Sequence, residues 1–115
     1  MDTRTKIVTT SEAIRLAAAG ATVVSGYFDP LLASHAERLA GLKRNGESLL
    51  VLIATPVDPI LPERARAELV AGLAVVDHVA AAAVGLEPHV RLEPEDDLRL
   101  EKLIRQVHAR HQAGS

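Results

Sequence analysis

Short apolar runs alternate with amphipathic segments along the chain, and this pattern predicts its strands and helices. Residues 21–24 and 49–54 are mostly apolar and rich in β-branched or leucine side chains, as buried strands are. Residues 75–83 form a third predicted strand, and residues 88–92 leave room for a short fourth. Each strand is therefore expected to be separated from the next by a helix or a loop.

The segments between these runs have helix signals at their ends. Thr, Ser and Glu at residues 9–12 open a first helix and Gly20 ends it, while the second runs from residue 34 or 35 to about residue 44, before Asn45-Gly46. Ser34 is its predicted cap. A third helix is expected at about residues 62–73, with a proline at its start, and a closing helix follows residues 94–97. The predicted apolar faces are Leu39, Ala40 and Leu42 on the second helix and Leu100, Leu103, Ile104 and Val107 on the last.

This order of elements predicts the α/β fold class. The expected architecture is a Rossmann-like three-layer αβα sandwich with a mostly parallel sheet of three to four strands. Parallel strands joined by right-handed crossovers have their carboxyl ends on one edge of the sheet. With 115 residues and 48% hydrophobic content, the chain is predicted to form a single domain, residues 1–115.

Composition and charge narrow the classes of partner. The formal net charge of −2 offers no basic footprint for nucleic acid, and the absence of cysteine excludes a disulfide framework and a thiolate metal site. The first six residues are polar, and no apolar run approaches the roughly 18 residues of a membrane span. We therefore expect a soluble, cytoplasmic protein that binds neither nucleic acid nor membrane.

Residues 26–35 join the first predicted strand to the second predicted helix, where helix N–H groups favour anions. The chain resembles here the cytidylyltransferase-like nucleotidyltransferases, most closely the adenylyltransferase domain that activates heptose phosphate. That family carries G-x-F-D-x-x-H-x-G-H, and Gly26, Phe28, Asp29 and His35 are in register with it. Leu32 stands at the first histidine position and Ser34 at the glycine position.

A second block of the chain matches the same family. The family has an N-P-x-x-x-R helix followed by x-x-V-D-x-V, and the matching residues here are Pro62, Arg66, Val76, Asp77 and Val79. The resemblance covers nearly the whole chain and implies a shortened nucleotidyltransferase fold. Two pieces of the family are missing, namely the basic, Gly-containing arm after the second strand and a strand-plus-helix segment between residues 83 and 88.

The resemblance also implies a site. His35 is the candidate catalytic residue, and the candidate nucleotide- or phosphate-binding residues are Gly26, Tyr27, Phe28, Asp29, Ser34, His35, Arg66 and Arg99. An active enzyme of this kind would use ATP or CTP with Mg²⁺. No protein metal site is predicted, because the spacing of His108 and His111 supplies only two ligands.

The departures from the motif indicate impaired catalysis. Leu32 has no hydrogen-bond donor, and loss of one oriented donor to a transition state costs about 2.7–4 kcal/mol. The Cβ of Ser34 narrows the approach to a phosphate. Asp96 and Asp97 stand at the start of the last predicted helix, where carboxylates satisfy the helix dipole and repel a triphosphate.

Several candidate residues have ordinary structural interpretations too. His35 can be a hydrogen-bonded turn residue, Asp29 a turn or capping group, and Arg66 a solvated or ion-paired side chain. Asp77 and His78 are expected to flank a strand.

We expect a catalytically impaired nucleotidyltransferase-like domain that binds a nucleotide or phosphorylated small molecule weakly, or that serves in an interaction. One alternative is an active enzyme that moves AMP or CMP from ATP or CTP onto a sugar or alcohol phosphate and releases pyrophosphate. The other is a structural module that forms a homodimer, with residues 80–84 covered by the second subunit.

Overall fold

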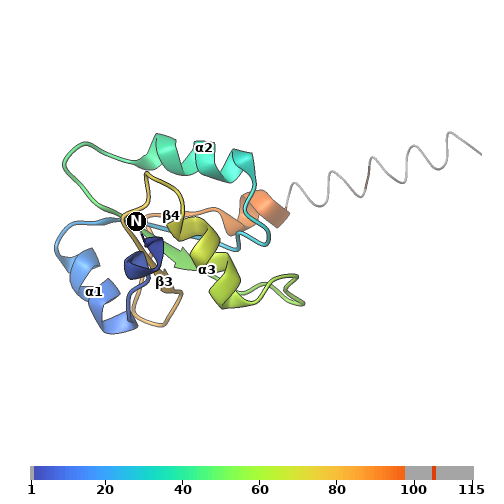
Figure 1. Cartoon of the computed structure of the whole chain (residues 1–115), viewed down its shortest axis with the longest axis horizontal. Coiled ribbons are helices and arrows are strands. Elements are labelled where there is room, and N and C mark those ends of the chain that lie inside the picture. The colour runs from blue at the N-terminus through green and yellow to red at the C-terminus, as the bar shows by residue number, and fades with distance from the viewer. Residues whose placement is uncertain (1, 98–104, 106–115) are drawn as a thin grey trace, which may run out of the picture.

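The computed structural model describes residues 2–97 and residue 105. Within these residues the elements follow one another in the order η1 (Thr3–Lys6), α1 (Thr10–Ala18), β1 (Thr22–Gly26), α2 (Ala33–Leu42), β2 (Leu49–Ile53), α3 (Glu63–Ala71), β3 (His78–Ala81) and β4 (Val90–Arg91) (Figure 1). Residues 93–97 are also helical. The predicted apolar face of the last helix, together with Arg99, His108 and His111, lies outside the described residues.

The four strands form one parallel sheet in the order β3-β2-β1-β4. Thr22 lies opposite Leu49, Leu50 lies opposite His78, and Val24 lies opposite Val90. Beyond β3, Ile7 forms a parallel bridge with Val79. The predicted α/β class and parallel sheet are confirmed.

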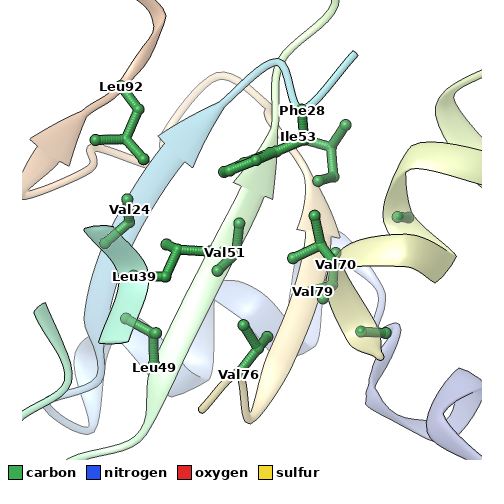
Figure 2. Packing of buried hydrophobic residues seen from close by; sticks show 12 residues of the cluster. Val24, Phe28, Leu39, Leu49, Val51, Ile53, Val70, Val76, Val79 and Leu92 are labelled. Atoms are coloured by element: carbon green, nitrogen blue, oxygen red, sulfur yellow. The ribbon is translucent and has the colours of Figure 1, made fainter. Parts of the chain in front are cut away.

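Helices cover both faces of this sheet. On one face, Leu39 of α2 and Val70 of α3 belong to a buried cluster that includes Val51 of β2 (Figure 2). On the other face, Ala13 of α1 packs in a second cluster with Leu50 of β2. Successive residues of β2 therefore enter opposite layers, which explains why this strand is apolar at every position.

The predicted signals at the ends of α1 and α2 are partly correct. The Thr9 side chain accepts a hydrogen bond from the Glu12 N–H and caps α1, and Gly20 follows it with a φ of 105°. Ser34 is not the cap of α2, because the helix already begins at Ala33 and Leu32 occupies the capping position. Ala40, predicted on the apolar face, is exposed.

The third strand is shorter than residues 75–83. After α3 the chain makes a turn in which the Val76 N–H donates to the Leu73 carbonyl, and β3 begins only at His78. Val76 is nevertheless fully buried, because this turn packs into the α2–α3 face. A run of apolar residues indicates burial but does not specify backbone conformation. The sequence pattern therefore predicted one strand where the structure has a turn followed by β3.

No helix within the described part of the chain has both the length and the apolar character that crossing a bilayer requires.

Candidate functional site

The sheet order places a crevice between the ends of β1 and β4. From β1 the chain passes to β2 and then β3 on one side, and β4 then pairs with β1 on the other side. Connections that leave neighbouring strands in opposite directions create the point where open α/β sheets bind ligands. A cavity of about 680 Å³ lies here, lined by the turn after β1, the loop after β2 and the helical residues after β4. It is the candidate site.

Gly26 and Phe28 of the predicted motif pack against each other beneath the turn that follows β1. Phe28 has a φ of 49° and is fully buried, with its ring over Gly26. A Cβ on Gly26 would lie 2.6 Å from Phe28 Cζ, closer than packed atoms approach. Neither residue lines the cavity. The geometry thus gives both residues a packing role beneath the candidate site.

His35 is buried at the floor of the cavity, and both of its ring nitrogens have partners. The Leu32 N–H donates to Nδ1 at 2.9 Å, and Nε2 lies 2.7 Å from Asp96 Oδ1. Since Nδ1 accepts a hydrogen bond, the ring proton is on Nε2 and is donated to the Asp96 carboxylate. The ring also packs edge-on against Phe28, with centroids 5.3 Å apart. His35 is therefore a hydrogen-bonded turn residue whose Nε2 is directed to an internal carboxylate.

Asp29 connects the turn to the loop between β2 and α3. Its Oδ2 accepts from the Ile60 N–H and its Oδ1 from the Leu61 N–H, both at 2.7 Å. Charge-assisted bonds to backbone N–H groups are among the strong hydrogen bonds of proteins. Asp29 is a structural group, as one interpretation predicted, although it binds a distant loop instead of its own turn.

Arg66 lies behind the cavity, between α3 and the sheet, and is 1% exposed. Its Nη1 donates to the carbonyls of Tyr27 and Ala54 at 3.1 and 2.6 Å, and its Nε donates to the Leu61 carbonyl at 3.1 Å. The expectation of a solvated or ion-paired side chain is therefore wrong. The guanidinium serves as a backbone clamp that ties the ends of β1 and β2 to the following loop.

Aspartates dominate the polar lining of the cavity. Asp29, Asp58, Asp96 and Asp97 line it, and no lysine or arginine of the described part of the chain does. Burial raises the pKa of the half-buried Tyr27 phenol, and the nearby charges of Asp97, Glu93 and Asp96 raise it further. The helix after β4 begins at Glu93, so Asp96 ends its first turn and Asp97 follows, and both carboxylates lie near the positive end of the helix dipole. The site carries a negative potential.

Aliphatic side chains form the remaining wall. Leu32, Val57 and Ile60 line the cavity with exposed fractions of 43%, 92% and 76%. Leu32, at the position of the missing histidine, contributes its backbone N–H to His35 and its side chain to the cavity. Ser34 is exposed in the first turn of α2 and does not line the cavity.

Sequence reasoning missed Val57, Asp58 and Ile60. They belong to the loop of residues 55–62, whose three prolines predict a rigid connection and nothing about a ligand. The signal available was the pair of large aliphatic residues in an otherwise loop-forming segment. The contact of His35 with Asp96, 61 residues apart, has no local signal at all.

Two further results bear on the site. Within the described residues, no group of three or more His, Asp or Glu side chains is arranged to hold a metal ion. No protein-family model matches the chain, and the search of curated proteins gives no match.

Proposed function

We propose that the chain is a non-catalytic, nucleotidyltransferase-like domain whose cavity between β1 and β4 serves in binding and not in nucleotidyl transfer. The observation that carries this proposal is the contact of His35 Nε2 with Asp96 Oδ1 at 2.7 Å. In a nucleotidyltransferase this ring donates to a phosphate oxygen, whereas here a carboxylate of the chain itself accepts the hydrogen bond.

The remaining lining supports the same proposal. Phosphoryl transfer needs several cationic or neutral donors that converge on the phosphate oxygens. Among the described lining residues, the side-chain donors are Tyr27 and His35, and they lie among four aspartates. This donor set does not fit a magnesium nucleoside triphosphate.

Pyrophosphate release from ATP and CTP, measured with Mg²⁺ over a panel of sugar and alcohol phosphates, tests the proposal. We expect no release above that of a blank, and no heat of binding for either nucleotide at millimolar concentration. Release that the His35→Ala variant abolishes would overturn the proposal and establish the active alternative. A control variant, Arg64→Ala, changes an exposed residue of α3 remote from the cavity lining.

A second candidate function is self-association through the connection between β3 and β4. Val84 of this connection is fully exposed, and a further cavity of about 530 Å³ beside it is lined by Leu52 and Ala82. The same cavity also has polar lining from Glu87, Arg91 and Glu93, so the large exposed aliphatic side chain of Val84 is the observation that favours an interface. Light scattering should report a dimer that Val84→Lys converts to a monomer, while a native chain that stays monomeric at high concentration contradicts this function.

A further inference from the structure

The cavity between β1 and β4 concentrates negative charge, whereas the chain as a whole is nearly neutral. The formal net charge of the protein is only −2, yet among the described residues four aspartates and no basic residue line this cavity. Arg38, on the neighbouring α2, is paired with Glu95 at 3.3 Å. Both ring nitrogens of His35 already have partners, the Leu32 N–H and the Asp96 carboxylate. The lining therefore favours a cation over a neutral or anionic ligand.

The aspartates differ in how far the fold already uses them. Both oxygens of Asp29 accept backbone N–H groups, and Asp96 binds His35. Asp58 and Asp97 are exposed and line the cavity from two walls, the loop after β2 and the helix after β4. A cation held between these two walls would meet two carboxylates that are reached from solvent.

The cavity also has an apolar wall. Six large hydrophobic side chains are exposed among the described residues, and three of them, Leu32, Val57 and Ile60, line this cavity. The loop that carries Val57 and Ile60 is fastened by Asp29 and by the Leu61 carbonyl's bond to Arg66. The wall is therefore held in place before a ligand arrives, which reduces the entropy lost on binding.

We propose that this cavity binds an ammonium or guanidinium group carried on an aliphatic body. This inference rests on the proposed binding function and names its ligand class. The charged group lies between Asp58 and Asp97, and the aliphatic body covers Leu32, Val57 and Ile60. The volume of about 680 Å³ is within the range of small-ligand cavities, which is about 300–1,000 Å³.

The test is a titration of the full-length ¹⁵N-labelled chain with hexylammonium, followed by NMR. Hexanol and hexanoate serve as neutral and anionic probes of matched length. We expect the largest shifts at the amides of Leu32, Ile60 and Asp97, with affinity falling in the order hexylammonium, hexanol, hexanoate. Binding of hexylammonium should weaken as NaCl is raised from about 20 mM to about 300 mM.

A double variant, Asp58→Asn with Asp97→Asn, removes the two rim charges. We expect hexylammonium affinity to fall about tenfold, because the variant removes the attraction of two surface carboxylates for the cation. The matched control, Glu37→Gln, removes a charge on the exposed face of α2 outside the cavity and should leave the affinity unchanged. Ile60→Ser should weaken hexylammonium and hexanol to the same degree.

A blocked Leu-Arg-Leu tripeptide separates two sources of the same chemistry. Tighter binding of the tripeptide identifies a peptide side chain as the ligand, and tighter binding of hexylammonium identifies a small amine. Equal affinity for hexylammonium and hexanol, shifts outside the cavity, or no binding of any cation would overturn the inference. None of these results bears on nucleotidyl transfer, which the pyrophosphate assay decides separately.

Discussion

At the scale of single residues, Gly26, Phe28 and His35 support one another by direct contact. The Phe28 ring lies over the Cα of Gly26 and meets the His35 ring edge-on. His35 then holds the first turn of α2 through the Leu32 N–H and reaches across to Asp96. Three residues of a supposed ligand-binding motif are thus explained by packing and hydrogen bonds within the fold.

Gly26→Ala should destabilise the protein by about 1–3 kcal/mol, the usual effect of overpacking a core. The new Cβ would lie 2.6 and 2.7 Å from two atoms of the buried Phe28 ring. Gly41→Ala is the matched control, since nothing lies within 4 Å of its added Cβ in α2, and it should stabilise by about 0.5 kcal/mol. Urea unfolding measures both, and equal effects of the two variants would contradict the packing role of Gly26.

At the scale of elements, the loop between β2 and α3 forms a wall of the cavity because two charged side chains fasten it. Asp29 accepts the backbone N–H groups of Ile60 and Leu61, and Arg66 donates to the Leu61 carbonyl and to the Thr55 hydroxyl. Both of these residues were predicted as ligand contacts. Arg66 shapes the site without lining it, and Asp29 lines the site although both of its carboxylate oxygens already accept hydrogen bonds.

Arg66→Met should lower the free energy of unfolding by about 3 kcal/mol or more, because three backbone carbonyls lose a buried donor. The control is Arg64→Met on the same helix. Arg64 is exposed and pairs only with Glu68 at i,i+4, so its loss should change stability by less than about 0.5 kcal/mol. Chemical denaturation compares the two, and an Arg66→Met protein as stable as the control would refute the clamp.

Asp29→Ala should loosen the same loop locally. Removal of both acceptors should accelerate amide hydrogen exchange at Ile60 and Leu61 by about tenfold or more. Asp58→Asn is the control within the loop, since asparagine tolerates the positive φ of 53° at that position. Unchanged exchange at both amides in Asp29→Ala would show that the prolines alone hold the loop.

At the scale of the whole molecule, Asp77 joins three parts of the chain at the amino ends of the strands. Its Oδ2 accepts from the Leu49 N–H at 2.7 Å and from the Lys43 ammonium, while its own backbone leads into β3. Burial raises the pKa of Asp77, but the bonds from Lys43 and Leu49 outweigh it, so the pKa lies below its ordinary value.

This depressed pKa predicts an acid-sensitive contribution to stability. The ionised carboxylate is favoured in the folded state, so its contribution is present above the unfolded pKa of about 4 and is lost as the pH falls through the lower, folded pKa. Asp77→Asn should therefore be less stable than the native protein at pH 7, and the difference should narrow below about pH 4.

Urea unfolding at several pH values measures this difference. Lys43→Met is the matched variant, because it keeps the Leu49 bond but removes the ammonium that lowers the pKa of Asp77. Its acid-dependent loss of stability should be smaller than that of the native protein and should end at a higher pH, because the folded pKa of Asp77 then lies closer to the unfolded value. A difference between native protein and Asp77→Asn that stays constant from about pH 7 to about pH 3 would contradict the assignment.

The sequence by itself determined the order of the elements and the class of the fold. Leu49 to Ile53 are apolar because the strand is buried on both faces, and Thr9 and Gly20 bound α1 through local backbone chemistry. These signals depend on neighbouring residues in the sequence, so they can be identified without knowledge of the tertiary contacts. Because these signals are local, they could not distinguish the burial of Val76 in a turn from burial in a strand.

Only the tertiary structure decided what the turn after β1 does. Whether His35 faces a phosphate or a carboxylate depends on β4 pairing beside β1, which brings Asp96 within 2.7 Å. Likewise, Arg66 is a clamp because α3 packs it against the ends of β1 and β2, whose carbonyls it binds. Such partners lie far away in sequence and are selected by topology, and a local motif therefore specifies the shape of this turn but not the charge that surrounds it.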